Sequence, residues 1–216
     1  MSEQVTGRAQ EQAKESAQAV DYPPEPWDLT GTGAITTWRV PVAALPPLPS
    51  GVRPAAWRGT ALVTTAFVRY DERGLMAYDE LLAAVLVRHG RGVALSITDI
   101  WVDSPTSVAG GRGHWGIPKD LATFGERYAE TADGPIASAS FSSRRGPDLR
   151  LPLPLRGSVV QTLDGATKAS PIRAGGTVRL ATARWDVADT GPLAWLRAGR
   201  PGVSLLAKDF SMRFGS

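Results

Sequence analysis

Turn signals divide this chain into many short segments, and their spacing constrains the fold more than any other feature of the sequence. Turns containing glycine or proline recur along the 216 residues, at GTG 31–33, PPLPSG 46–51, DERG 71–74, RHGRG 88–92, ADG 132–134, RRGPD 144–148, AGG 174–176 and DTGP 189–192. The segments between them are rich in Val, Ile, Thr and aromatic residues, which strands favour. Short strands joined by frequent turns predict a sandwich or a barrel.

The hydrophobic pattern places the individual strands. In GVALSITDIWV, residues 92–102, the side chains of Val93, Leu95, Ile97 and Trp101 are expected on one face, with polar residues facing the other way, which is the two-residue period of a strand. By the same reasoning we expect strands over residues 33–40, 59–70, 78–89, 92–102, 124–131, 135–143, 157–163, 177–187 and 203–214.

Two segments combine features of helix and strand. YDELLAAVLV, residues 78–87, has helical propensities, but the hairpin-like HGRG that follows favours a strand. PVAALPP, residues 41–47, fits a short helix. The expected fold class is therefore mainly β with minor α: a mostly antiparallel sheet with one or two short helices.

Composition argues against several classes of protein. No run of 18 apolar residues predicts a transmembrane helix, so we expect no membrane partner. Residues 1–22 show no apolar stripe and no secretory signal, which predicts a mobile tail followed by one domain over residues 23–216. The absence of cysteine rules out disulfides and thiolate metal sites, and we expect a cytoplasmic location. The net charge is only +3 and the arginines are scattered, so we expect no nucleic-acid partner.

Two apparent motifs in the segment GGRGHWGIPKDLATF, residues 110–124, point to no cofactor or metal. GRGHWG, residues 111–116, matches G-x-G-x-x-G, but no strand leads directly into it and the chain lacks alternating strands and helices, so we expect no dinucleotide. His114 has no acidic residues at metal-ligand spacing, and the one other histidine, His89, lies in an expected turn. We expect His114 to pack beside Trp115 or to be exposed.

Lys119 is the residue in this segment that is best suited to act as a nucleophile. It is one of only four lysines, and it follows Pro118 in a run of apolar and aromatic residues. Burial among such groups would disfavour the ammonium and lower the pKa, and a neutral amine can attack a carbonyl to form a Schiff base. Pro118 would fix the local backbone and help to aim the side chain. The alternative is an exposed lysine whose stem covers apolar surface.

The chain resembles the acetoacetate decarboxylase family at three places. GRGHWGIPKDL is similar to the active-site segment of that family, in which G-R-E precedes P-K-K-L at the same spacing. GLMAYDELLAAV, residues 74–85, resembles its Y-x-E segment, and TGPLAWL, residues 190–196, resembles a late G-P-x-x-L-x-L strand. The three occur in the family's order within residues 30–214.

This resemblance implies a closed or cone-like β-barrel around an apolar cavity. It makes Lys119 the Schiff-base amine and Glu80 a cavity acid that exchanges protons, whereas a glutamate after a turn is otherwise most often solvated. Tyr78 shares the face of Glu80 on a strand, and with Arg112, Trp115 and Pro118 it completes the expected substrate-binding set.

The implied activity is that of a lyase that acts on a small ketone or oxo acid, by decarboxylation or by aldol or dehydration chemistry. No metal or organic cofactor is expected, because the amine itself supplies the electron sink, and exposed strand edges favour a homo-oligomer. Two alternatives remain open. One is a non-catalytic barrel that binds a small apolar or carbonyl ligand, and the other is a surface interaction module with a solvent-open Lys119.

Three positions depart from the family pattern. Asp120 replaces the second lysine of P-K-K and would raise the pKa of Lys119 if the two side chains met. Gly113 replaces the glutamate of G-R-E. Gly31 stands where the family has an arginine suited to a substrate carboxylate, and Arg39 or Arg112 are the substitutes that the sequence offers.

Overall fold

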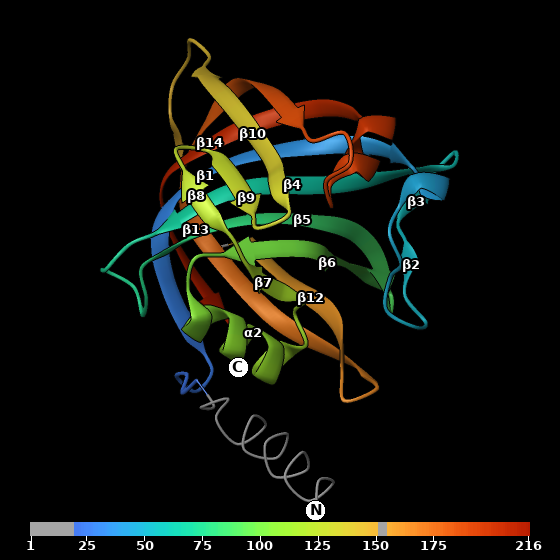
Figure 1. Cartoon of the computed structure of the whole chain (residues 1–216), viewed down its shortest axis with the longest axis vertical. Coiled ribbons are helices and arrows are strands. Elements are labelled where there is room, and N and C mark those ends of the chain that lie inside the picture. The colour runs from blue at the N-terminus through green and yellow to red at the C-terminus, as the bar shows by residue number, and fades with distance from the viewer. Residues whose placement is uncertain (1–19, 151–154) are drawn as a thin grey trace, which may run out of the picture.

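The computed structural model describes residues 20–150 and 155–216. Their elements are β1 (Trp27–Pro41), the 3-10 helix η1 (Val42–Ala44), β2 (Arg53–Pro54), β3 (Ala56–Trp57), β4 (Thr60–Tyr70), β5 (Tyr78–His89), β6 (Gly92–Val102), α2 (Pro105–Trp115), β7 (Lys119–Leu121), β8 (Thr123–Gly125), β9 (Tyr128–Thr131), β10 (Gly134–Ser143), β11 (Leu149–Arg150), β12 (Leu155–Leu163), β13 (Ala166–Val187), the 3-10 helix η2 (Ala194–Ala198) and β14 (Arg200–Phe214). The predicted mainly β fold class is confirmed (Figure 1).

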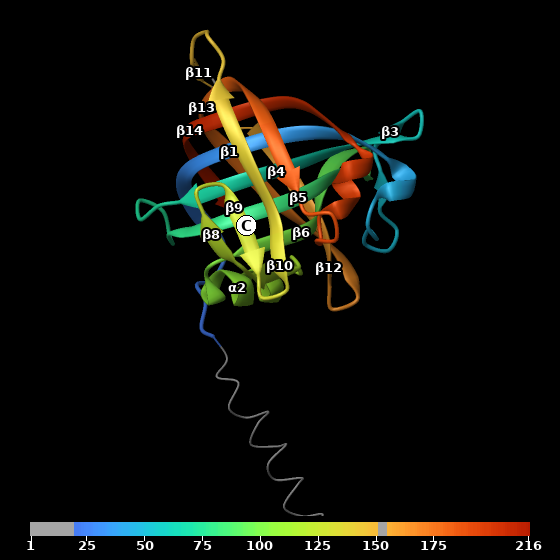
Figure 2. The same cartoon turned by 45° about the horizontal axis from the view of Figure 1, so that its top comes forward.

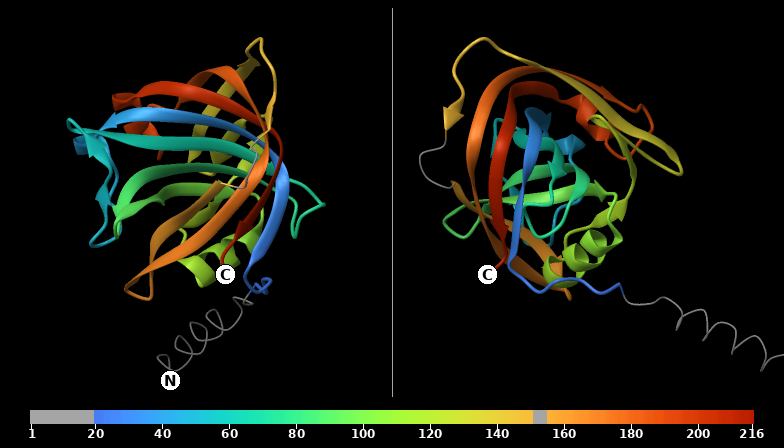
Figure 3. Two further views of the ribbon diagram at one scale, coloured as in Figure 1. Left: turned by 180° about the vertical axis from the view of Figure 1, so that it is seen from behind. Right: turned by 90° about the vertical axis from the view of Figure 1, so that its left-hand side faces the viewer.

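The long strands pair in a ring. The order β12-β6-β5-β4-β1-β14-β13 returns to its start because β13 also pairs with β12, and β10, β9 and β8 continue outward from β13. Nearly all pairs are antiparallel, although β6 pairs in parallel with β7 and with β12. Two views at right angles to each other show this ring-like sheet from behind and from one side (Figure 3). The closed, cone-like barrel stays a prediction.

The ring gives its strands an inner and an outer face. On β5, Glu80 and Leu82 line an interior cavity, whereas Leu81, Ala83 and Val85 point outward into a hydrophobic core. Because successive side chains of a strand alternate between faces, β5 contributes residues both to the cavity and to the outward core. The outward core is covered by β9, β10 and η2, and β10 runs across this side of the ring (Figure 2).

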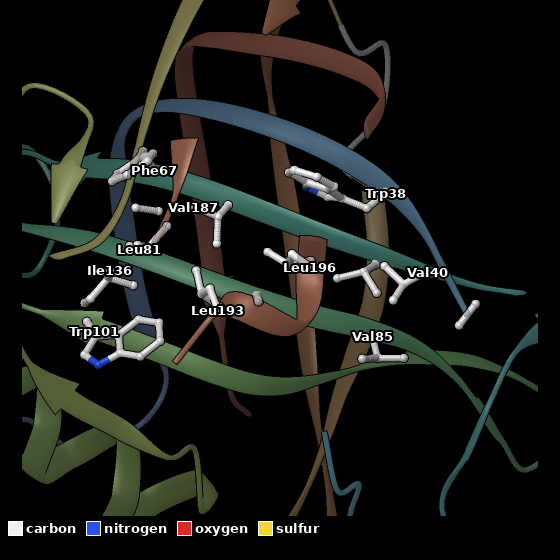
Figure 4. Close-up of a cluster of buried hydrophobic side chains, with 14 of the residues drawn as sticks. Trp38, Val40, Phe67, Leu81, Val85, Trp101, Ile136, Val187, Leu193 and Leu196 are labelled. Carbon is white, nitrogen blue, oxygen red and sulfur yellow. The ribbon is translucent and has the colours of Figure 1, made fainter. Parts of the chain in front are cut away.

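Tight packing of large apolar side chains holds this cover in place. Leu193, which precedes η2, and Leu196 within it are fully buried against Val40 and Val85 of the ring (Figure 4). The TGPLAWL segment at 190–196, whose motif is similar to one on a strand, leads instead into the 3-10 helix Ala194–Ala198. The ring is therefore supported from outside while its interior stays free of this packing.

Several other strand predictions need correction. Residues 124–131 form not one strand but a hairpin, with Thr123–Gly125 paired to Tyr128–Thr131. On β6, Leu95 and Ile97 line the cavity as expected on a shared face, but Trp101 lies in the outward core and Val93 is 57% exposed. For Trp101 the cause is a register shift between Ala83 and Ala84 of β5, opposite Asp99 and Ile97, which reverses the alternation beyond Ile97. Val93 lies before this shift, at the exposed start of the strand.

The helix α2 was not predicted from the sequence. Its start carries ordinary capping signals: Ser104 accepts a hydrogen bond from the backbone N–H of Ser107, and Pro105 occupies the first turn. It ends at Gly116, which has a positive φ of 64°. Glycines inside the helix weaken its propensity by about 1 kcal/mol each, so tertiary packing must stabilise it.

One expectation falls partly outside this description, and two others can be compared with it. Most of the tail predicted over residues 1–22 lies outside the described residues, which begin at residue 20. Within the described ranges, no helix is both long and apolar enough to cross a bilayer. A short helix was expected in residues 41–47, and η1 over Val42–Ala44 confirms it.

Candidate active site

A cavity of about 390 Å³ lies inside the ring of strands. Strands β1, β4, β5, β6, β12, β13 and β14 contribute most of its wall, and Trp115, Ile117 and Lys119 close one part of it. Almost all lining side chains are apolar. The polar or charged ones among the described lining residues are Thr64, Tyr70, Tyr78, Glu80 and Lys119. Four of these five meet at one place, which makes that place the candidate active site.

The backbone around residue 119 directs the lysine into the cavity. The strand β7 pairs in parallel with β6, with Lys119 opposite Ile100. Lys119 is only 4% exposed, while Asp120 next to it points outward. The helix α2 packs directly on the lysine stem, since a Cβ at Gly111 would lie 2.7 Å from its Cδ. The strand alternation and a glycine contact together fix the position of the amine.

Three oxygen atoms surround the amine of Lys119. Its Nζ donates to Glu80 Oε2 at 2.8 Å, to Ser107 Oγ at 2.9 Å and to the Tyr78 hydroxyl at 3.4 Å. The other carboxylate oxygen of Glu80 accepts a hydrogen bond from the Tyr70 hydroxyl at 3.1 Å. All five residues are buried, so these hydrogen bonds are shielded from water.

Burial and charge oppose each other at Lys119. Burial lowers the pKa of the amine, but the Glu80 carboxylate and the Tyr78 hydroxyl raise it by more, so the Lys119 pKa lies above its ordinary value of 10.5. The expectation of a lowered pKa is wrong for this arrangement. Burial, with the charge on Glu80, raises the pKa of Tyr70 well above its usual range, and burial is also the main cause of a raised Tyr78 pKa. Both tyrosines therefore carry their protons at neutral pH.

The predicted site residues divide into two groups. Lys119, Glu80, Tyr78 and Trp115 come together at the cavity, and the indole N–H of Trp115 donates to Glu25 Oε2 at 2.7 Å. Arg112 and Pro118 are exposed and do not line the cavity.

Asp120 does not meet the lysine side chain, and His114 packs against aromatic residues rather than forming a metal site. Asp120 is 71% exposed in its side chain and lies 3.7 Å from Arg112, so it does not contact the lysine amine. His114 packs edge-on against Tyr22, with a ring-centroid distance of 4.9 Å, and lies beside Trp115 as expected. Among the residues described, no three side chains of His, Asp or Glu are grouped to hold a metal.

The sequence analysis did not identify Ser107 and Tyr70, two of the five residues that are hydrogen-bonded to one another around the amine. Ser107 contacts the amine from α2, and the Ser104–Pro105 capping signal would have placed it in the first turn of a helix. Tyr70 ends β4 directly opposite Tyr78, which begins β5, so the DERG turn between these strands was the signal for their contact. The surface-module alternative required an open Lys119 and no interior cavity, and the structure contradicts both requirements.

One protein-family model matches this chain. The family described as Acetoacetate decarboxylase (ADC) matches residues 9–145, which is more than half of the chain. The chain belongs to the acetoacetate decarboxylase family. No curated protein matches it in sequence.

Solved structures show the same fold at low sequence identity. The chain is similar to the enduracididine biosynthesis enzyme MppR, solved with pyruvate, with a TM-score of 0.63 and 17% identity over 94% of this chain and 92% of that one. The acetoacetate decarboxylase of Legionella pneumophila gives 0.65 and 16% over 92% and 91%. An acetoacetate decarboxylase-like enzyme from Sphingomonas wittichii RW1 gives 0.61 and 14% over 94% of each chain.

The departures from the acetoacetate decarboxylase pattern have local structural causes. At Gly113 an added Cβ would lie 2.2 Å from the hydroxyl of Tyr22, so the aromatic residue fills the space that a larger side chain would need. At Gly31 an added Cβ would lie 2.1 Å from the backbone oxygen of Arg69. No arginine fits there on this backbone.

Proposed function

We propose that this protein is a lyase-type enzyme in which Lys119 forms a Schiff base with a ketone or oxo-acid substrate. One observation carries the proposal: the buried amine of Lys119 lies 2.8 Å from the Glu80 carboxylate in the wall of an apolar cavity. A buried amine and carboxylate in contact can exchange a proton without water, and a pair of this kind in a cavity is a candidate for catalysis.

Because its pKa is raised, Lys119 must lose a proton before its amine can attack a carbonyl, and Glu80 is the contacting group that can accept this proton. The ammonium gives one proton to Glu80, and the neutral amine attacks the carbonyl carbon of the substrate. The carbonyl oxygen leaves as water after taking two protons, one returned by Glu80 and the other released by the nitrogen after its attack. The product is a protonated imine beside a carboxylate, so the total charge of the site is the same before and after the condensation.

The protonated imine then acts as the electron sink for the lyase reaction. When a bond to the neighbouring substrate carbon breaks, its electron pair moves toward the imine nitrogen and an enamine forms. Glu80, restored to a carboxylate, is placed to accept a proton and later to return it to the enamine carbon. Water then hydrolyses the imine and frees Lys119. The steps require no other electron acceptor.

Neighbouring groups hold the two reactive side chains in position. Ser107 Oγ and the Tyr78 hydroxyl contact the amine, and the Tyr70 hydroxyl holds the second carboxylate oxygen of Glu80. Trp115 and Ile117 line the cavity together with Lys119, whose side chain is only 5% exposed. The pyruvate complex of MppR supports a carbonyl substrate, since that protein has a similar fold.

Chemical trapping tests this proposal. The protein is incubated with a panel of ketones and oxo acids that includes acetoacetate and pyruvate, then reduced with borohydride, and the adduct is located by peptide mass spectrometry. We expect the substrate-derived mass on Lys119, and none at that peptide in Lys119→Met. Glu80→Gln should slow the labelling at least tenfold, because the amine loses the group that accepts its proton.

The second candidate is a non-catalytic protein that binds a small apolar or carbonyl ligand. The raised pKa of Lys119 favours this alternative, because the amine is mainly an ammonium. In that case apolar ketones bind, as calorimetry would show, but borohydride yields no adduct with any of the panel. Binding without an adduct would therefore replace the enzymatic proposal by this one.

A further inference from the structure

The cavity has no spare positive charge for an acidic substrate. Among its described lining residues, Lys119 and Glu80 are the only ones with a charge, and they neutralise each other at 2.8 Å. A carboxylate that entered this space would lose its hydration without a cation to replace it, which opposes its entry. It would also lie in the same apolar space as the negative charge of Glu80.

The arginines that could provide such a cation lie elsewhere. Arg112 is exposed and pairs with Asp120, and Arg39 is also exposed, with neither among the lining residues. Gly31 cannot be replaced by a residue with a side chain without moving the backbone of Arg69. Neither substitute considered for the carboxylate site therefore reaches the cavity.

The cavity extends well beyond the reactive pair. Glu80 and Ala84 both line it and are four residues apart on β5, a distance of about 13 Å at the usual rise of a strand. Its volume of about 390 Å³ corresponds to about a dozen water-sized groups at roughly 30 Å³ each. Leu155, at the start of β12, also lines the cavity and is 62% exposed, which places an apolar residue between the interior and solvent.

We infer that the site takes an uncharged carbonyl compound with an extended apolar body, in preference to a small oxo acid. The carbonyl group lies at Lys119 and the apolar body lies along β5 toward Ala84. This inference rests on the proposed function, because it names the substrate class of the same lysine. It favours aldol-type or dehydration chemistry over loss of carbon dioxide, since the preferred substrate brings no carboxylate.

The charge requirement is tested with two ketones of similar shape. 5-Methylhexan-2-one and 4-oxopentanoate differ in that an isopropyl group in the first replaces the carboxylate of the second. Each is titrated against the protein with borohydride, and labelling of Lys119 is measured by mass spectrometry. We expect the neutral ketone to give half-maximal labelling at a concentration at least tenfold lower. Equal labelling, or a preference for the acid, would overturn the inference and leave the lysine chemistry standing.

The length requirement is tested with nonan-2-one and one cavity variant. Wild type should be labelled by nonan-2-one at a lower concentration than by 5-methylhexan-2-one. Ala84→Leu should weaken the labelling by nonan-2-one at least tenfold more than that by the shorter ketone, whereas Ala169→Leu, the same change at an exposed position of β13, should not alter their ratio. An unchanged ratio in a folded Ala84→Leu protein would contradict the placement of the apolar body. Absence of labelling by every carbonyl compound would overturn the proposed function itself.

Discussion

Removal of one partner from the Lys119–Glu80 pair should destabilise the fold far more than the same change in an ion pair of equal length beside it. Asp79 precedes Glu80 on β5, and its carboxylate accepts a hydrogen bond from Arg69 of β4 at 2.8 Å. The distance from Lys119 Nζ to Glu80 Oε2 is also 2.8 Å. The side chains of Lys119 and Glu80 are 5% and 4% exposed, whereas those of Arg69 and Asp79 are 62% and 20% exposed. Burial is therefore the main difference between the two pairs.

The expected magnitudes follow from this difference. An exposed ion pair contributes at most about 1 kcal/mol, because water screens it. Removal of one partner from a buried pair costs about 3–5 kcal/mol, because the remaining charge has neither a partner nor water. At about 2–4 °C per kcal/mol for a chain of this size, Glu80→Gln should lower the melting temperature by roughly 6–20 °C. Asp79→Asn should lower it by no more than about 4 °C.

Urea unfolding at pH 7 measures both pairs as double-mutant cycles. One cycle uses Glu80→Gln, Lys119→Met and the double variant, and the other uses Asp79→Asn, Arg69→Met and their combination. We also expect the cost of Glu80→Gln to decrease at alkaline pH, because an unpaired buried lysine can release its proton and then needs no partner. A coupling energy for the buried pair no larger than that for the exposed pair would refute this reasoning.

The remaining predictions concern the groups around the pair. Gly111→Ala should reduce borohydride labelling at least tenfold while the helix content by circular dichroism is kept, because its Cβ would force the Lys119 stem to move; unchanged labelling would contradict that contact. The raised pKa of Tyr70 means that its contribution to stability is present below about pH 10 and is lost as the pH rises further, so the stability advantage of wild type over Tyr70→Phe should shrink above pH 10 in urea titrations. A constant advantage up to pH 11 would argue against burial of that hydroxyl. Asp120→Asn should leave the rate and pH dependence of labelling unchanged, because the Asp120 carboxylate points to Arg112, and a shifted pH profile would show that it acts on the amine after all.

Most of the strands could be predicted from the sequence because turn residues and a two-residue period are local signals. The face assignment of Trp101 failed because it depends on a register shift against β5, which no local pattern reports. The helix α2 was not predicted for a different reason. Its three glycines lower helix propensity, yet each accommodates a close contact: Gly110 with Trp27, Gly111 with Lys119 and Gly113 with Tyr22.

The candidate site was predictable in its members but not in its electrostatics. The motif around Lys119 and the spacing of Tyr78 and Glu80 identified the main residues. The pKa of Lys119 depends on a contact between residues 39 positions apart, whereas the local sequence indicates only burial and the adjacent Asp120. The partner that raises the Lys119 pKa most is Glu80, the residue for which the family resemblance implies a role in proton exchange.

Exchange of the carbonyl oxygen with solvent tests the central claim most directly. Formation and hydrolysis of a Schiff base replace the ketone oxygen by one from water, so nonan-2-one in ¹⁸O-labelled water should gain the heavy isotope, measured by mass spectrometry of the recovered ketone. Wild type should accelerate the exchange at least tenfold over buffer, and Lys119→Met should not. An equal acceleration by Lys119→Met, or no acceleration by wild type with nonan-2-one or with any other ketone or oxo acid of the panel, would contradict a covalent role for the buried amine.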